Sequence, residues 1–181
     1  MLLITLNLPK SLLTFCFFTR MAHTACLLLG TNLGDRSNNL ERAKALLESE
    51  AGVISNASAI YETAAWGVSD QPAFWNQVLV IETGLLPAAL LQKIHEIESA
   101  LGRERRERWT ARTLDIDILY FDTEVLQSPT LVIPHPQIPF RRFTLVPLAE
   151  ILPDYVHPVL QKTNADLLVA CPDGLSVVRV G

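Results

Sequence analysis

The hydrophobic pattern opens with a short buried strand followed by an amphipathic helix. Residues 25–29 form an uninterrupted apolar run that ends at a glycine, which is typical of a buried strand. Residues 37–51 carry apolar side chains at helical spacing, and a glycine follows them directly. The positions that would share the buried face of this helix are Leu40, Ala43 and Leu47.

Further strands and a second long helix follow. Alternating or continuous apolar positions predict strands at 53–61, 75–83 and 113–121. A helix is predicted over 87–102, because a proline suits its first turn, an apolar stripe runs along it and a glycine closes it. After a segment divided by several prolines, a last short helix is predicted at 164–170.

These elements occur in the order strand, helix, strand, strand, helix, strand, which is the split β-α-β order of ferredoxin-like folds. The predicted fold class is therefore α+β: a ferredoxin-like β-α-β-β-α-β core with an antiparallel sheet, two main helices covering one face, and extra C-terminal elements. An irregular stretch at 62–74 interrupts the pattern, and connections of this length are often functional. The fold class alone does not identify the chemistry.

Composition describes a globular protein of ordinary size. The chain has 181 residues, of which 49% are hydrophobic and 19% charged, so it carries too much apolar material for a disordered protein. The net charge is −4, and basic residues gather only over 103–112. A nucleic-acid-binding domain usually carries a broad basic face, so we expect no nucleic acid partner and a local anion site instead.

The first residues differ from the rest of the chain. Residues 1–22 are read as an N-terminal extension that does not conform to the following domain, which would span 23–181. The apolar part of the extension is broken by Pro9 and Lys10 and is too short for a membrane-spanning helix. We expect Met21 to be the true start, and no membrane partner; a signal peptide or an export function is the alternative.

The cysteines give an expectation for the compartment. Cys16, Cys26 and Cys171 are odd in number, lie far apart and show no metal-binding spacing. Reduced cysteines in a reducing compartment are the plain interpretation, so we expect a cytoplasmic protein.

The strongest chemical pattern is a pair of aspartates in the last predicted core strand. Because alternate residues of a strand share a face, Asp115 and Asp117 would point the same way. Two adjacent carboxylates repel each other, and a divalent cation such as Mg²⁺ would neutralise them. A solvated sheet face is the alternative. Leu119 and Phe121 favour a site, because on strict alternation they would share the aspartates' face while Tyr120 would lie on the other.

An arginine-rich segment precedes that strand. Five arginines and no lysine fall between Arg103 and Arg112. The planar guanidinium suits phosphate oxygens, often in bidentate geometry. A solvated helical face with ion pairs to the interleaved glutamates is the alternative, but a cationic segment leading into a carboxylate pair favours a polyphosphate site. The chain has no Gly-x-x-x-x-Gly-Lys-Ser/Thr motif and is therefore not a P-loop enzyme.

Several ordered motifs make the chain resemble the 6-hydroxymethyl-7,8-dihydropterin pyrophosphokinase family of folate biosynthesis over about residues 24–160. The motifs are Leu-Gly-Thr-Asn-Leu-Gly-Asp near the first strand, Tyr-Glu-Thr at 61–63, Asp-Gln-Pro-Ala-Phe-Trp-Asn at 70–76, Arg-Trp-Thr-Ala-Arg-Thr-Leu-Asp-Ile-Asp at 108–117, Pro-His-Pro at 134–136 and Arg-Arg-Phe at 141–143. The resemblance implies transfer of diphosphate from ATP to the pterin hydroxymethyl group, giving AMP and the pterin diphosphate.

The resemblance also implies a set of site residues. Two Mg²⁺ ions would be bound by Asp115 and Asp117, and these aspartates together with Arg103 and Arg112 would form the catalytic set. The positions that match ATP contacts are His95, Glu98, Arg103, Arg105, Arg108, Trp109, Arg112, Ile118, His135 and Arg141. The positions that match pterin contacts are Thr63, Trp66, Phe74, Asn76 and Phe143, with the pterin ring between the two phenylalanines.

Other interpretations remain at this stage. Phe74 and Phe143 could belong to the core, His135 could be structural, and Trp109 could pack within its own segment. Three departures from the family pattern concern loops: Thr110 replaces a usual glycine, two alanines follow Thr63, and the arginine segment is one residue shorter than in some members, which leaves the position of Arg105 open.

Two other functions are the rivals. A Mg²⁺-dependent nucleotidyltransferase or phosphohydrolase would use the same aspartates but would not need the paired aromatics. A ferredoxin-like nucleic-acid-binding module would need exposed sheet aromatics and a basic surface. The small-molecule substrates ATP and hydroxymethyldihydropterin are the expected partners, and the protein is expected to be a monomer or weak homodimer.

Overall fold

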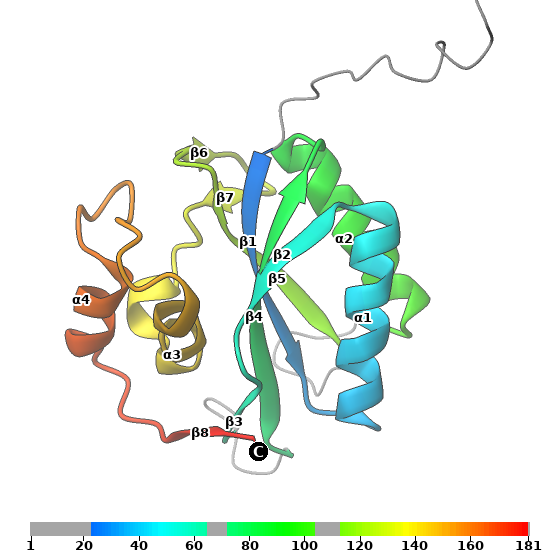
Figure 1. Cartoon of the computed structure of the whole chain (residues 1–181), viewed down its shortest axis with the longest axis horizontal. Helices are drawn as coiled ribbons and strands as arrows, with labels where there is room; N and C mark the ends of the chain where they lie inside the picture. The colour runs from blue at the N-terminus through cyan, green and yellow to red at the C-terminus, as the bar shows by residue number, and fades with distance from the viewer. Residues whose placement is uncertain (1–22, 65–71, 104–112, 181) are drawn as a thin grey trace, which may run out of the picture.

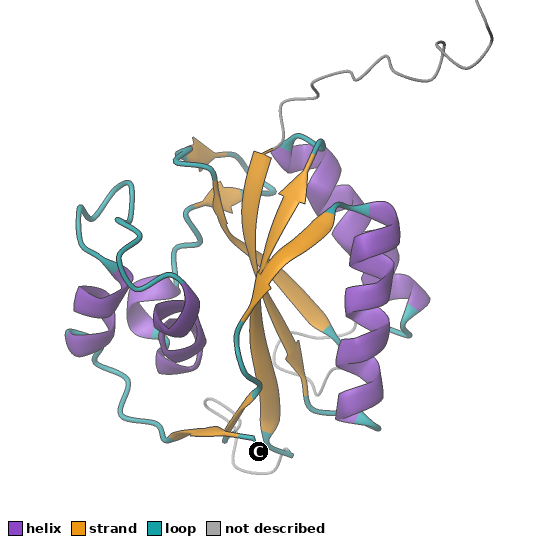
Figure 2. Ribbon diagram, viewed as in Figure 1, coloured by secondary structure: helices purple, strands orange, loops and turns teal. Residues whose placement is uncertain are grey.

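The computed structural model describes residues 23–64, 72–103 and 113–180, and in that part of the chain an antiparallel sheet is covered by helices on both faces (Figures 1 and 2). Its main strands run in the order β5-β1-β4-β3-β8, and β2 also pairs with β4. The strands are β1 (His23–Thr31), β2 (Val53–Ala57), β3 (Tyr61–Thr63), β4 (Phe74–Thr83), β5 (Asp115–Phe121) and β8 (Val177–Arg179).

The predicted α+β class with an antiparallel sheet is confirmed, and the chain follows the predicted β-α-β-β-α-β order with one additional strand. The helices α1 (Arg36–Glu50) and α2 (Pro87–Ala100) both cover one face of the sheet (Figure 1). The opposite face carries α3 (Arg142–Ile151), with α4 (Asn164–Val169) beside it (Figure 1). A small separate sheet of β6 (Leu126–Gln127) and β7 (Val132–Ile133) follows β5, and a 3-10 turn, Ile138–Phe140, leads into α3.

Two apolar cores lie on the two faces of the sheet. Between the sheet and α1 and α2 the core contains Leu27, Leu47 and Ile94, all fully buried. Under α3 it contains Val78 and Leu145, also fully buried. Removing such side chains from water is the main stabilising contribution, worth about 1.5–3 kcal/mol for each large apolar residue.

Local signals explain where α1 begins and ends. The Asp35 side chain accepts a hydrogen bond from the Asn38 amide at 3.0 Å, which caps the helix. Beyond its C-terminus, Gly52 lies against β4: a Cβ added there would be 2.3 Å from the Glu82 carbonyl oxygen. Glycine is therefore required for this close approach of two backbones.

The middle of the chain differs from the sequence prediction. The strand predicted at 53–61 is two strands, β2 and β3, and the stretch predicted as irregular from residue 62 begins inside β3. A register shift between Ile54 and Asn56 bends β2, and β3 then pairs farther along β4. Hydrophobic spacing alone does not specify such a bend.

The alternation predicted for β5 is correct at its start and wrong at its end. Ile118 pairs with Leu27 and Tyr120 with Cys26, so one extra residue, Leu119, is inserted there. This bulge turns Leu119 and Tyr120 to the α3 side and Phe121 to the α1–α2 side. Leu119 therefore shares the aspartates' face, as predicted. The predictions for the next two residues are wrong, because Tyr120 lies on the aspartates' face and Phe121 lies on the opposite face.

Within the described residues, no helix combines the length and the hydrophobicity needed to cross a membrane. The proposed boundary at residue 22 stays a prediction, because 1–22 lie outside the described part of the chain.

Candidate active site

One row of residues across three strands links the aspartates to the predicted pterin contacts. Gly30 on β1 pairs with Asp115 on one side and with Asn76 on the other. Directly opposite residues of antiparallel strands share a face, so Asp115 and Asn76 flank the glycine on the α3 side of the sheet. A Cβ at Gly30 would lie 3.4 Å from Asn76 Oδ1. Because glycine has no side chain, the sheet surface between the Asp115 carboxylate and the Asn76 amide stays open.

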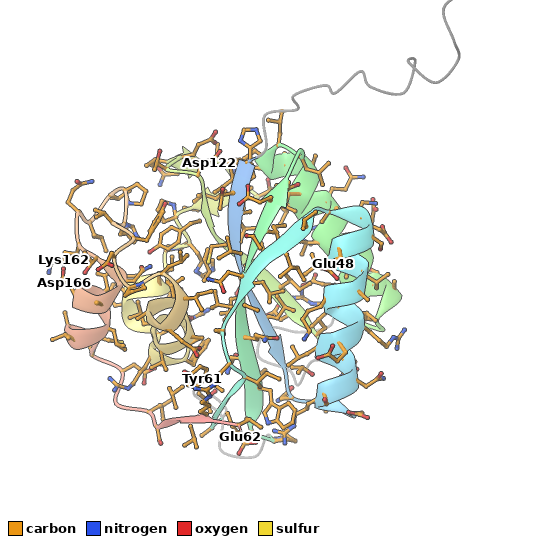
Figure 3. The ribbon with its side chains drawn as sticks, viewed as in Figure 1. Glu48, Tyr61, Glu62, Asp122, Lys162 and Asp166 are labelled. Atoms are coloured by element: carbon orange, nitrogen blue, oxygen red, sulfur yellow. The ribbon has the colours of Figure 1, made fainter. Side chains whose placement is uncertain are left out.

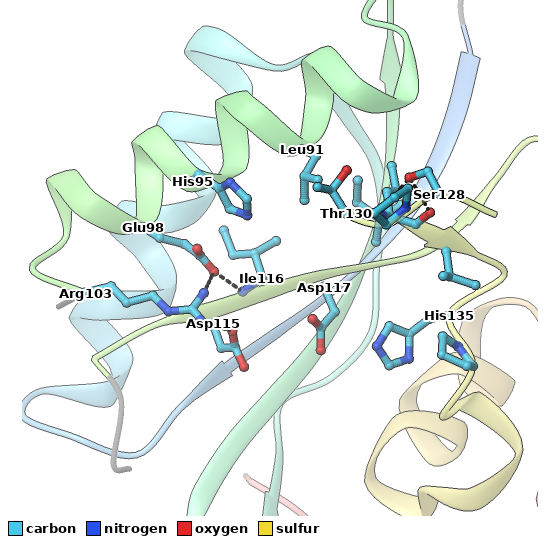
Figure 4. Close-up of a pocket in the computed structure, with 15 residues that line it drawn as sticks. Leu91, His95, Glu98, Arg103, Asp115, Ile116, Asp117, Ser128, Thr130 and His135 are labelled. Atoms are coloured by element: carbon cyan, nitrogen blue, oxygen red, sulfur yellow. Dashed lines mark hydrogen bonds and ion pairs between the residues drawn. The ribbon is translucent and has the colours of Figure 1, made fainter. Parts of the chain in front are cut away.

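A pocket of about 350 Å³ lies along the open edge of β5, between α2 and the segment 128–136 (Figure 4). The predicted site residues that line it are His95, Glu98, Arg103, Asp115, Asp117, Ile118 and His135. Its other lining residues are Leu91, Ile116, Ser128, Pro129, Thr130, Leu131, Val132 and Pro136. Arg141 is not among the lining residues. The pocket therefore brings together most of the described residues that the sequence assigned to ATP.

Glu98 of α2 organises the inner wall of this pocket. Its side chain is 1% exposed, and Oε1 accepts a hydrogen bond from the Ile116 amide at 2.8 Å. The same oxygen accepts a hydrogen bond from Arg103 Nη1, and Arg103 Nη2 lies 2.8 Å from Asp115 Oδ1 (Figure 4). Arg103 therefore connects Glu98 to the aspartate pair, and Glu98 covers the open backbone edge of β5.

The electrostatics of the pocket depend on burial. Burial raises the pKa of Glu98, and the hydrogen bond from the Ile116 amide and the charge of Arg103 oppose that change. Burial and the neighbouring Asp115 carboxylate raise the pKa of Asp117 to about 6. The pKa of His135 is lowered to about 4, mainly by burial and to a smaller extent by the nearby Arg141 charge. His135 is therefore neutral at pH 7, and its Nδ1 accepts a hydrogen bond from the Gln137 amide at 3.2 Å.

The aspartate pair fits a divalent cation of the magnesium type. The raised pKa of Asp117 means that its carboxylate lacks full compensation from the described protein groups, and a cation would provide it. The described residues contain no group of three or more His, Cys, Asp or Glu side chains that could hold a metal ion. Mg²⁺ is commonly bound by only one or two carboxylates, with water and substrate phosphates completing its octahedron.

The predicted pterin contacts that the structure describes lie on the α3 side of the sheet. Asn76 is 3% exposed, and its Nδ2 donates to Thr63 Oγ1 at 2.9 Å. Phe74 pairs directly with Thr63 across β4 and β3, so both face the same way. Phe143 lies on α3 and packs against the core beneath it, and the Arg141 guanidinium lies 5.6 Å from the centroid of its ring. That the two phenylalanines enclose one ligand stays a prediction.

Several predicted site residues lie outside the described part of the chain. They are Trp66, Arg105, Arg108, Trp109 and Arg112.

One wall of the pocket consists of residues that the sequence motifs did not predict. Residues 128–132 line it, and the hydrogen bonds of Ser128 to Leu131 hold them in a turn. The backbone amide of His135 also donates to the Leu119 carbonyl at 2.9 Å, which attaches this segment to the edge of β5. The repeated prolines after the aspartate strand were the available signal, because they exclude long regular elements there.

A cluster around Arg36, which no sequence motif predicted, fixes the chain just before Phe74. Arg36 Nη1 donates to the Ala73 carbonyl at 2.8 Å and to Glu62 Oε2 at 3.0 Å. Glu62 Oε2 also accepts from Trp75 Nε1 at 2.9 Å, and the Arg36 guanidinium lies 4.4 Å from the centroid of the Trp75 ring. The start of α1 thus holds the entry into β4.

Comparison with known proteins identifies the family. The family model for 7,8-dihydro-6-hydroxymethylpterin-pyrophosphokinase (HPPK) matches residues 26–153. A Bacillus subtilis protein named 2-amino-4-hydroxy-6-hydroxymethyldihydropteridine pyrophosphokinase is 45% identical over 132 residues, which cover 72% of this chain and 79% of the relative. An Aquifex aeolicus protein of the same name is 42% identical over 139 residues, covering 77% of this chain and 86% of the relative.

The fold comparison agrees. A crystal structure of Plasmodium falciparum HPPK-DHPS matches with a TM-score of 0.71 at 20% identity, over 82% of this chain and 45% of the other. Because the family model covers most of the chain and relatives above 40% identity align over most of their length, the chain belongs to the 7,8-dihydro-6-hydroxymethylpterin pyrophosphokinase family.

Proposed function

We propose that this chain transfers the diphosphate of ATP to 6-hydroxymethyl-7,8-dihydropterin through the site built around Asp115 and Asp117, with two Mg²⁺ ions bound there. The activity, a step of tetrahydrofolate biosynthesis with ATP as co-substrate, is that of the family to which the chain belongs. The observation that carries the site assignment is the row Asp115–Gly30–Asn76, which joins the pocket at the edge of β5 to the amide and hydroxyl on β4 and β3.

ATP is assigned to the pocket beside β5. Its volume of about 350 Å³ lies at the lower end of the usual range for small-molecule sites. Leu91, Ile118 and Val132 give it an apolar wall suited to a flat base, while His95 and His135 offer polar edges. Arg103 would meet the phosphates, because it already lies beside Asp115.

Asp115 and Asp117 would hold the magnesium ions against the phosphates. Bound there, the ions would neutralise the negative charge of both the carboxylates and the polyphosphate. The protein's own contribution is to fix the two carboxylates on one sheet face and to orient Arg103 through Glu98. Arg112 would add a second cation from the neighbouring segment.

The pterin is assigned to the α3 side of β3 and β4. Asn76 offers an amide to the polar edge of the ring, and Thr63 holds that amide in place. Phe74 and Phe143 would stack on the two faces of the ring, and Trp66 completes the proposed set. This arrangement would direct the hydroxymethyl group towards the aspartates.

The reaction joins the two halves of the site. The pterin hydroxyl oxygen attacks the β-phosphorus of ATP, the new O–P bond forms, and the bond between that phosphorus and the α,β-bridging oxygen breaks. AMP leaves with the bridging oxygen and its electron pair, and the hydroxyl proton passes to solvent. His135 has a lowered pKa and is a weak base, so we assign catalysis to positioning and charge neutralisation.

Product analysis tests this function. The protein is incubated with ATP, Mg²⁺ and 6-hydroxymethyl-7,8-dihydropterin, and nucleotides are separated by chromatography. We expect AMP to form in a one-to-one ratio with pterin diphosphate. Formation of ADP would instead indicate an ordinary kinase, and pterin-independent hydrolysis of ATP would favour the rival phosphohydrolase.

We further propose a cytoplasmic protein that is a monomer or weak homodimer and binds no nucleic acid. The substrates of the family are small molecules, and the net charge of −4 opposes binding to a polyanion. Sedimentation at several protein concentrations tests the oligomeric state.

A further inference from the structure

The C-terminal segment 171–180 joins the two elements that carry the proposed pterin contacts. From the end of α4 it runs beneath α3 and ends as β8 beside β3 (Figure 1). In β8, Val177 pairs with Thr63 and Arg179 with Tyr61. One segment therefore contacts both the strand that carries Thr63 and the helix that carries Phe143.

At its helix end the segment supplies a missing cap. Arg141 is the N-cap residue of α3, and its side chain has no acceptor for the free amides of the first turn. Asp173 compensates from 31 residues farther along: its Oδ2 accepts from the Arg142 amide at 3.0 Å. A carboxylate at this end also interacts favourably with the helix dipole. The beginning of α3, where Phe143 is the second residue, is thus fixed by Asp173.

Asp173 is itself fixed within the segment. Its second oxygen, Oδ1, accepts from the Leu175 amide at 3.0 Å, so both carboxylate oxygens are used. At the strand end, the Val180 amide donates to the Ile60 carbonyl at 2.8 Å. Glu150 of α3 adds two further contacts: its Oε2 accepts a hydrogen bond from the Ala59 amide at 2.8 Å, and its Oε1 lies 4.0 Å from Arg179 Nη1. Figure 3 shows Tyr61 and Glu62 at this end of the sheet, beside the C-terminal strand.

We infer that Asp173 is a positioning residue for the pterin site, which it serves by fixing the start of α3 relative to β3. The inference rests on the proposed assignment of Thr63 and Phe143 to the pterin. Residues 171–180 lie beyond the region 26–153 that the family model matches, so the family match does not include this connection. Phe143 lies in the first turn of α3, whereas Arg141 at the same helix end does not line the pocket proposed for ATP. Because a displacement of about 1 Å in a binding site is costly, loosening this connection weakens pterin binding more than ATP binding.

The test compares the loss of two helix caps on the full-length protein. Asp173→Ala removes the cap of α3, and Asp173→Asn keeps only one of its two acceptor oxygens. The matched control is Asp166→Ala, because Asp166 completes the capping box of α4, which carries no proposed substrate contact (Figure 3). Steady-state AMP formation gives KM for the pterin and for ATP, and melting temperatures follow the stability of each variant.

We expect Asp173→Ala to raise the pterin KM at least fivefold while the KM for ATP stays within twofold, with Asp173→Asn intermediate. Asp166→Ala should lower the melting temperature by about as much as Asp173→Ala does, and it should leave both KM values unchanged. If Asp173→Ala and Asp166→Ala affect the pterin KM equally, the segment only stabilises the fold and the inference is wrong. If the wild-type protein forms no pterin-dependent AMP, the proposed function fails instead, which keeps the two conclusions distinct.

Discussion

Asp115 and Asp117 place two carboxylates on one face of β5, where both line the pocket beside α2. Alternation along a strand is enough to put two carboxylates on one face, and the structure agrees because the bulge in β5 begins only after Ile118. The sequence does not reveal that Asp117 is largely surrounded by protein, and that surrounding raises its pKa. An acidic residue under these conditions favours a cation, since its charged form is destabilised by burial.

We expect Asp115→Asn and Asp117→Asn each to lower turnover by about 100-fold or more, because each removes a charge that the proposed ions require. The melting temperature should not fall in Asp117→Asn. The folded-state pKa of this group is raised, so its charged form destabilises the protein above about pH 6, and a neutral amide removes that cost. Steady-state kinetics and thermal denaturation at pH 7.5 measure both effects.

EDTA provides the independent control for the aspartates. Chelation should abolish turnover of the wild-type protein reversibly, and added Mg²⁺ should restore it. Full activity in EDTA, or an Asp115→Asn variant as active as the wild type, would exclude a metal at this pair.

Arg36 illustrates a residue that sequence analysis could not assign. Its partners Glu62, Ala73 and Trp75 are distant in the sequence, and no local pattern joins them. We expect Arg36→Met to raise the pterin KM by about three- to tenfold and to change the KM for ATP little, since it frees the chain that leads into Phe74.

A neighbouring ion pair offers the matched control for Arg36. Lys44 of the same helix contacts Glu41 at 2.6 Å on an exposed surface, where such pairs contribute little. Lys44→Met should therefore leave both KM values unchanged. Equal kinetic behaviour of the two variants would show that the Arg36 cluster does not support the site.

At the scale of elements, periodicity predicted which segments form strands and helices but not where the strands bend. In β5 the inserted Leu119 reverses the faces of the following residues, so Tyr120 joins the core under α3. Tyr120 Oη then donates to Asn164 Oδ1 at 2.8 Å, a contact that attaches α4 to the sheet. The bulge is a property of the pairing with β1, and a single strand sequence does not contain that information.

The junction between α1 and β2 depends on a single glycine. We expect Gly52→Ala to destabilise the protein by at least about 2 kcal/mol, because its Cβ would be 2.3 Å from the Glu82 carbonyl oxygen and neither backbone can move without disturbing the sheet. Gly174→Ala is the control, since a Cβ there meets nothing within 4 Å. Chemical denaturation of both variants measures the difference, and equal stabilities would mean that the junction relaxes freely.

At the scale of the whole molecule, the two substrates are assigned to different elements. The pocket proposed for ATP is built by α2, β5 and the segment 128–136, whereas the proposed pterin contacts come from β3, β4 and α3. Sequence motifs predicted both sets, but the sequence could not show that residues 128–132 form one wall of the pocket or that a C-terminal strand lies against β3. Both features arise from contacts between segments that are far apart in the chain.

This separation gives a prediction for the aromatic residues. Phe74→Ala or Phe143→Ala should weaken pterin binding about tenfold or more, since stacking on each ring face is worth about 1 kcal/mol in addition to the buried area that is lost. Binding of a non-hydrolysable ATP analogue to the free protein should change by less than about twofold, because neither side chain lines the pocket beside β5. Calorimetric titration with each ligand separates the two effects.

Phe140 supplies the control, because it lies just before α3 and three residues from Phe143 but is 53% exposed. Phe140→Ala should bind both ligands as the wild type does. If Phe74→Ala and Phe143→Ala instead lose pterin and nucleotide equally and melt at a lower temperature, the two rings act as core residues. The pterin would then have to bind elsewhere on the sheet, and the row from Asp115 to Asn76 would lose its proposed function.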